Sequence, residues 1–348
     1  MNAPSAAKTG WIVSARYDTL FFTASLGAPL LLWAAFSMNL MTGVAVYVAF
    51  QIAFNMPHNF QTWTVSVLDA EDREKYGTRY AIAFGVCLLV LGVPMVLSPE
   101  GVYPWVRNAL IYWGYYHLVR QHYGFQRMYE RKMGGVSPRE SFWYGRYLDA
   151  VSYLPLLIRF GAKENMTIHA GGKTSWVFHP VLPTPAVAAL SALLAVIIIA
   201  AAVHHVIMWR QKRPGFGPRG LLLLSVTVAF ALAGIVIGDF IVAVAVVTAF
   251  HNLQYLGLLW FHNQNRAAAG ATAGNPTITW LATGKLPLYF AITFAYGVAI
   301  FLPRALFRND LLAELPIAAV VAMHYYVDAR IWKFKEYPRR GAWLRLSS

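Results

Sequence analysis

About ten apolar runs, each close to the length that crosses a lipid bilayer, divide this chain. A spanning helix needs about 20 apolar residues at a rise of about 1.5 Å per residue, so run 220–262 is too long for one span. Gly234 and Gly238-Asp239 are the expected break within it. The expected spans are 19–37, 40–67, 80–98, 104–127, 142–160, 181–209, 220–237, 239–262, 279–302 and 312–334. We therefore expect an all-α, polytopic helical bundle that forms one transmembrane domain over residues 1–348.

Composition favours the same fold class. Hydrophobic residues make up 58% of the chain and charged residues 13%, whereas a soluble domain has about 25% charged residues. The net charge of +14 is spread over short loops, so a nucleic-acid partner is not expected. The lone cysteine, Cys87, excludes an intramolecular disulfide and a cysteine-based metal site. No cleavable signal is expected, because the first apolar run begins near Leu20 and further spans follow it.

The basic residues predict how the chain is oriented. Most of the 29 Lys and Arg residues lie in the N-terminal segment, in alternate loops and in the C-terminal tail. Because loops rich in Lys and Arg stay on the cytoplasmic side, both termini are expected there, with 1–18 and 335–348 as cytoplasmic segments. An even number of spans follows, and we expect a multi-pass protein of a bacterial cytoplasmic (inner) membrane.

Histidines recur at similar depth in the runs that lead toward the predicted cytoplasmic side. Ionisable groups at membrane depth are costly unless paired and mark functional sites by default. Imidazole is also the commonest protein metal ligand. The histidines fall in the later half of their runs, which places the expected site in the cytoplasmic half of the membrane. The expected metal ligands are His58, His117, His122, His251, His324 and Asp328.

In run 40–67, Asn55, His58, Asn59 and Thr62 follow the spacing of one helical face. Pro57 frees a backbone carbonyl just before the histidine, which is tolerated where other groups satisfy it. A polar stripe that joins helices by hydrogen bonds is the structural alternative.

In run 104–127, His117 and His122 lie about 140° apart around a helix and about 7.5 Å apart along it. Either a π-bulge realigns them, or one binds the metal and the other supports it. Gln121 is the expected acceptor for an imidazole N–H. Arg120, a predicted catalytic residue, is expected to pair with an aspartate (Asp149, Asp239 or Asp328) or to reach the interface.

In run 239–262, His251 shares a stripe with Gln254 and Tyr255, which complete the predicted catalytic set. His262 lies about 16.5 Å from His251 along the helix, near the predicted boundary, where a solvated histidine is expected. His204-His205 also look interfacial, and His169 and His179 are expected outside the site.

In run 312–334, His324 and Asp328 share one face at i, i+4. Asp328 either binds the metal or fixes the tautomer of His324. An ion pair with Arg330 or Arg120 is the competing interpretation. The residues from Ile331 to Lys335 are expected to form an aromatic and cationic interface anchor.

A nitrogen-and-oxygen donor set without sulfur suits iron, with zinc and copper as alternatives. The many aromatic residues of run 104–127 suit an elongated apolar substrate that enters from the bilayer. We therefore expect an iron-dependent, O2-dependent oxygenase (an oxidoreductase) acting on a lipid or isoprenoid, with an electron donor as a further partner.

Four segments in order, Pro57-His58, His122-Tyr123-Gly124, His251 and His324 with Asp328, resemble the Brp/Blh-type membrane β-carotene dioxygenases. The resemblance implies a helical membrane enzyme that uses histidine-bound, non-haem iron to cleave or oxygenate an isoprenoid chain.

Two other classes of membrane protein remain open. A proton-coupled or ion-coupled transporter would use a relay of His, Asp and Arg and would carry ionisable groups in both membrane halves; Asp239, Asp149 and Lys285 are compatible with this. A haem-binding electron-transfer protein needs matched histidine spacings on two helices. His251 and His262 do not match His117 and His122 in this way.

Overall fold

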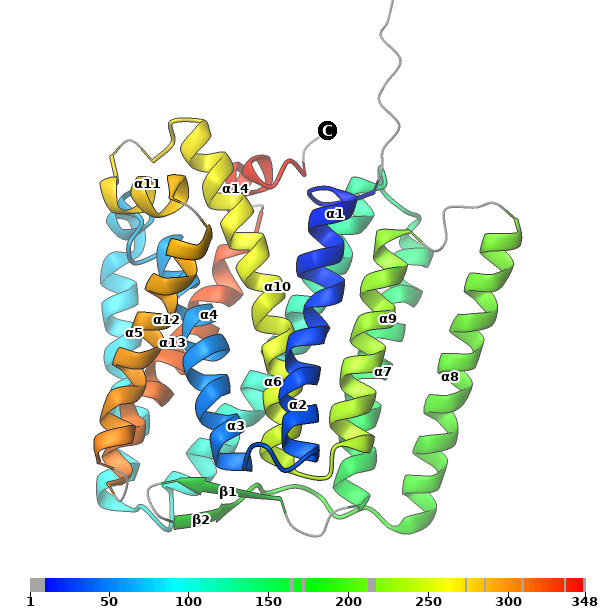
Figure 1. Ribbon diagram of the computed structural model, residues 1–348, viewed down its shortest axis with the longest axis horizontal. Coiled ribbons are helices and arrows are strands. Elements are labelled where there is room, and N and C mark those ends of the chain that lie inside the picture. The colour runs from blue at the N-terminus through cyan, green and yellow to red at the C-terminus, as the bar shows by residue number, and fades with distance from the viewer. Residues whose placement is uncertain are drawn as a thin grey trace, which may run out of the picture.

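Helices that run between the two ends of a bundle make up most of the chain (Figure 1). The computed structural model describes residues 10–162, 166–170, 173–211, 217–272, 274–284, 286–307, 310–334 and 336–346. Within these ranges, seven helices are long and apolar enough to span a membrane, as in a multi-pass membrane protein. They are Ala15–Ser37, Ala70–Leu97, Thr184–Met208, Pro218–Val236, Phe240–Ala268, Leu286–Leu306 and Leu311–Ile331.

These seven helices correspond to labelled elements of the bundle. In chain order the elements are α1 (Ala15–Asp18) continued by α2 (Gly27–Ser37), α5 (Ala70–Leu97), α8 (Thr184–Arg210), α9 (Pro218–Ala231), α10 (Phe240–Ala268), α12 (Leu286–Leu306) and α13 (Leu315–Ile331). The expected break in run 220–262 is present, because α9 ends in a π-helical turn at 232–236 and α10 begins at Phe240. Asp239 caps α10 by accepting a hydrogen bond from the Val242 backbone N–H (2.9 Å).

Three more helical segments lie in the expected runs but are not among the helices that are long and apolar enough to span a membrane. They are α3 (Gly43–Phe50) joined to α4 (Met56–Thr64), α6 (Tyr103–Lys132) and α7 (Pro138–Ala162). The expected helix at 142–160 is therefore present within α7, although arginine and aspartate residues interrupt its apolar pattern.

The short elements lie at the two ends of the bundle (Figure 1). α1 and α14 (Pro338–Trp343) lie at one end, together with α11 (Pro276–Thr283). The other end carries an antiparallel hairpin of β1 (Thr167–Ala170) and β2 (Lys173–Trp176), which is an addition to the expected helical fold. Residues 1–9, 335 and 347–348 of the predicted flanking segments, and Lys285, lie outside the described residues.

α10 lies at the centre of the bundle, whereas α8 and α5 lie at its outside. In the most apolar window of each helix, 78% of the α10 residues are buried, against 6% in α8 and 17% in α5. The outer helices expose large apolar side chains such as Val86, Val196 and Ile199, a surface that suits lipid tails. A histidine on α10 is therefore surrounded by protein.

A π-helical turn, Gln51–Asn55, joins α3 to α4. The turn ends two residues before Pro57, whose backbone nitrogen cannot donate a hydrogen bond and whose ring clashes with the carbonyl four residues earlier in a regular helix. The wider turn accommodates the proline where such local adjustments are tolerated. Gly297 of α12 lies against the backbone of this turn, because a Cβ added there would overlap the Ile52 carbonyl.

Candidate metal centre

Four histidines from four helices meet in the interior of the bundle. His58 lies on α4, His117 on α6, His251 on α10 and His324 on α13, and none is more than 8% exposed. The centres of the His58 and His324 rings are 4.4 Å apart, and those of His117 and His251 are 5.2 Å apart. These four side chains are called the histidine cluster below.

The Nε2 atoms of the cluster converge. His324 Nε2 lies 2.9 Å from His58 Nε2 and 3.2 Å from His117 Nε2. Two imidazoles that bind one ion at about 2.0–2.1 Å have their nitrogens about 2.9 Å apart at a right angle and about 3.4 Å apart in a tetrahedral site. Donor atoms of His58, His117 and His251 also lie within 4.8 Å of one another. The donor set and its spacing therefore fit a transition-metal ion held by imidazoles.

A hydrogen-bonded chain leads from Asp328 to His324. Tyr255 donates its hydroxyl proton to Asp328 Oδ1 (2.5 Å), so its oxygen accepts from the Thr62 hydroxyl at 3.0 Å. Thr62 Oγ1 then accepts from His324 Nδ1–H at 2.7 Å. With its proton on Nδ1, His324 has a free lone pair on Nε2, which is the form that binds a metal.

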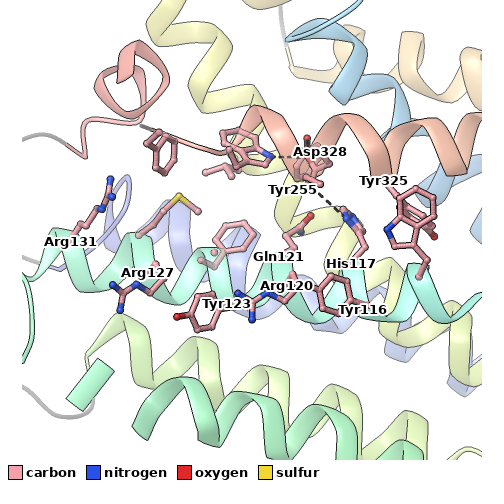
Figure 2. A pocket seen from close by; sticks show the side chains of 18 residues that line it. Tyr116, His117, Arg120, Gln121, Tyr123, Arg127, Arg131, Tyr255, Tyr325 and Asp328 are labelled. Carbon is pink, nitrogen blue, oxygen red and sulfur yellow. Dashed lines mark hydrogen bonds and ion pairs between the residues drawn. The ribbon is translucent and has the colours of Figure 1, made fainter. Parts of the chain in front are cut away.

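Asp328 lies behind two of the histidines. Its Oδ2 is 3.8 Å from His117 Nδ1, and Figure 2 shows the two side chains approaching across the cavity between α6 and α13. Its Oδ1 also accepts a hydrogen bond from the Trp332 indole (2.8 Å). A carboxylate on the Nδ1 side of a ligating imidazole orients the ring and raises its basicity. Donor atoms of Asp328, His117 and His324 also lie within 4.8 Å of one another, so direct ligation stays open.

His122 lies next to the cluster. α6 is a regular α-helix from Tyr103 to Lys132, so no π-bulge brings His122 onto the face of His117. His122 Nδ1 donates to the Leu118 carbonyl (2.9 Å), and its ring centre is 5.8 Å from that of His251. Its Nε2 is buried and has no hydrogen-bond partner among the described residues. Of the two interpretations of this pair, the geometry is compatible with His117 as ligand and His122 as its neighbour.

Two glutamines hold the backbone near the cluster. Gln121 was expected to accept from an imidazole, but its Nε2 donates to the His251 backbone carbonyl (3.0 Å). Gln254, a predicted catalytic residue, donates through Nε2 to the Phe22 carbonyl (2.8 Å). Both contacts tie α10 to neighbouring elements at the depth of His251.

Arg120 has none of the three predicted aspartate partners. Its guanidinium is exposed and lies 4.2 Å from the centre of the Tyr123 ring. Asp149 pairs with Arg146 (2.6 Å), and Asp239 caps α10. Of the two expected alternatives for Arg120, the ion pair with an aspartate is therefore excluded, and the exposed guanidinium lines a cavity beside His117.

The remaining histidines lie away from the cluster. His262 was expected at a solvated boundary, but it is fully buried between Trp332 and Trp343, because α14 and the end of α13 cover this part of α10. On the outer helix α8, His204 and His205 lie near Tyr144. His179 stacks on Phe160 at the end with the hairpin. The side chain of His169 lies outside the described part of the chain.

Two cavities adjoin the cluster, and His117 and Tyr325 line both. One has a volume of about 290 Å³ and extends from the cluster past Phe230 to Arg107 and Glu314. The other has a volume of about 380 Å³ and lies between α6 and α13 (Figure 2). The cluster is therefore bordered by two cavities.

Sequence reasoning missed two parts of this site. Trp332 was assigned to an interface anchor, but its indole donates to Asp328. Tyr325 received no role, although it lies between the two cavities. The available signal was weak: ligand pockets are commonly lined by aromatic side chains, and Tyr325 is one of several in its run.

Comparisons of the chain with models of protein families, with curated proteins and with solved structures give no match. The resemblance to the Brp/Blh-type dioxygenases stays a prediction from four short segments. Of the residues that carry it, His58, His251, His324 and Asp328 lie at the cluster, whereas His122 lies beside His251.

Proposed function

We propose that this protein is an integral membrane metalloenzyme, an O2-dependent oxygenase that acts on a lipid or isoprenoid at non-haem iron. The observation that carries the proposal is the convergence of three Nε2 atoms, at 2.9 and 3.2 Å, in a buried cluster from separate helices. With its proton on Nδ1, His324 offers one lone pair on Nε2, which cannot accept a full hydrogen bond from both neighbouring imidazoles, whereas one ion between the rings accounts for both distances.

The chain's own residues would hold and orient the ion. His58, His117, His251 and His324 supply the imidazoles, while Thr62 and Tyr255 set the tautomer of His324. Non-haem iron, when bound, supplies one-electron and O2 chemistry, and zinc or copper are the alternative ions for such donors. The apolar walls of the two cavities bind the substrate chain and exclude water from the reacting carbon. An electron donor is expected to dock at the cytoplasmic side.

We further propose that ten segments span the membrane, with both termini in the cytoplasm of a bacterial cell. Three of the ten segments are not among the helices that are long and apolar enough to span a membrane. Two of these three, α4 and α6, carry His58, His117 and their polar neighbours. The polar site itself therefore lowers the hydropathy of these helices. With ten spans, the end of the bundle that carries α1 and α14 is also the end whose loops are rich in Lys and Arg, as expected of the cytoplasmic side.

The second candidate is a proton-coupled or ion-coupled transporter. The observation that favours it is the pair of cavities on either side of the cluster, one of which reaches Arg107, Arg159 and Glu314. The histidines and Asp328 would then form a relay between the two cavities.

Elemental analysis of the purified protein tests the proposal. The wild type is compared with the variants His58→Ala, His251→Ala and His324→Ala, and with His262→Ala as a buried control outside the cluster. We expect near-stoichiometric iron in the wild type and the control and its loss in the three cluster variants, followed by oxygen consumption with lipids or carotenoids. No tightly bound metal in the wild type, even after reconstitution with ferrous iron or zinc, overturns the enzyme proposal. Proton-coupled uptake in vesicles then supports the transporter, and an absorbance spectrum of the same samples tests the haem alternative.

A further inference from the structure

The cavity between α6 and α13 has an apolar interior that ends at the cluster. His117 and Asp328 lie at its inner end, and its walls include Tyr116, Trp332 and Phe334. α6 runs from this inner end to Lys132, at the same end of the bundle as α14 (Figure 1). The cavity is called the α6–α13 groove below.

Three arginines line the α6–α13 groove. Arg120, Arg127 and Arg131 follow the spacing i, i+7, i+11, which places them in one row about 16.5 Å long on α6. Figure 2 shows this row along the helix, outward from His117. All three side chains are exposed. The row therefore presents guanidinium groups to whatever enters the groove.

Most of this positive charge is not neutralised by the protein. Arg127 pairs with Glu130 (2.7 Å), whereas the guanidinium groups of Arg120 and Arg131 lie over the aromatic rings of Tyr123 and Phe334, respectively. Among the described residues, neither Arg120 nor Arg131 forms an ion pair with a carboxylate. Arg120 lies within the expected span 104–127, and a guanidinium at membrane depth is expected to have an anionic partner. The fork geometry of all three guanidinium groups matches carboxylate and phosphate oxygens.

We propose that the α6–α13 groove binds a bilayer-resident amphiphile with an anionic head group, a carboxylate or a phosphate, as the substrate of the proposed enzyme. The head group contacts the arginine row, and the apolar chain passes Tyr116 to reach the histidine cluster. The groove thus repeats the polarity of one leaflet, with charge toward the helix end and apolar surface at depth. That the amphiphile is a substrate rests on the proposed function, whereas its binding in the groove requires no metal.

Binding of three C18 probes to the protein in phosphatidylcholine nanodiscs tests the inference. The probes are oleate, oleyl phosphate and oleyl alcohol, which share a chain and differ in head-group charge. The triple variant Arg120→Gln, Arg127→Gln, Arg131→Gln is compared with Arg16→Gln, Arg139→Gln, Arg210→Gln, which removes the same charge from exposed sites outside the groove. The iron content of each sample is measured in parallel.

We expect oleate and oleyl phosphate to bind the wild type more tightly than oleyl alcohol. In the groove variant their Kd should rise about tenfold, since three partly exposed ion pairs are lost, while iron content and the affinity for oleyl alcohol stay unchanged. Equal binding of all three probes, equal losses in the two variants, or displacement of oleate by inorganic phosphate at the same concentration overturns the inference. Charge-dependent binding by a protein that holds no iron sustains the inference and refutes the proposed function, so the two failures are distinguishable.

Discussion

Replacing Thr62 by valine tests the hydrogen-bonded chain between Asp328 and His324. The substitution keeps the branched shape and removes the hydroxyl that contacts His324 Nδ1 at 2.7 Å and Tyr255 at 3.0 Å. The His324 Nδ1–H then has no acceptor, which costs about 1–3 kcal/mol for a buried donor. The ring is free to rotate or to change tautomer, and its Nε2 is no longer held toward His58 and His117.

If that cost weakens the free energy of iron binding, iron affinity falls about ten- to a hundredfold. This is the usual effect of losing a group that orients a ligating histidine. Competition with a coloured iron chelator in detergent measures this change. Thr62→Ser keeps the hydroxyl and should restore most of the affinity.

Thr64→Val is the matched control, because Thr64 is a buried threonine of the same helix whose hydroxyl contacts Gln61 and Asn263 but no histidine of the cluster. It should lower the melting temperature of the metal-free protein and leave iron affinity unchanged. An unchanged iron affinity in Thr62→Val, or an equal loss in both valine variants, refutes the assignment of Thr62 to the orientation of His324.

Two further substitutions probe the carboxylate and the packing of the bundle. Asp328→Asn keeps an oxygen that can accept from Tyr255 and removes the negative charge next to His117 Nδ1. We expect about tenfold weaker iron binding in the same competition assay. An unaltered affinity would contradict a role of the Asp328 charge in orienting His117. Gly297→Ala forces a Cβ into the Ile52 carbonyl and should destabilise the fold by about 1–3 kcal/mol. Thermal unfolding measures this loss against Gly85→Ala, which meets no atom within 4 Å, and equal melting temperatures would show that α12 moves aside without cost.

The helices themselves were predictable because each depends on a local run of residues. Apolar length predicted the segments now seen as α5, α8 and α12, and Gly234 with Gly238-Asp239 marked the break before α10. Pro57 likewise indicated a disturbed backbone ahead of His58, which the structure shows as a π-helical turn. A small hairpin, β1 with β2, was not predicted, because strands of four residues leave too short a pattern to recognise.

The site was predictable in part. The shared depth of the histidines follows from their places in the runs, and the structure brings His58, His117, His251 and His324 together. The environment of His262 was predicted wrongly, and the sequence did not decide between the two alternatives for Arg120, because a helix's own sequence does not say which neighbours cover it. His262 is buried by α14 and the end of α13, which lie far from it in the chain.

The sequence by itself determined that this protein consists of apolar helices with histidines at a common depth, because segment length and residue position are local properties. Only the tertiary structure decided how each helix is rotated about its axis. That rotation places His117 in the cluster and His122 beside it, joins Thr62, Tyr255 and Asp328 into one hydrogen-bonded chain, and turns the arginine row of α6 toward the groove. The physical reason is that rotation depends on packing between helices, and a helix with polar residues on several faces carries no single stripe that specifies it.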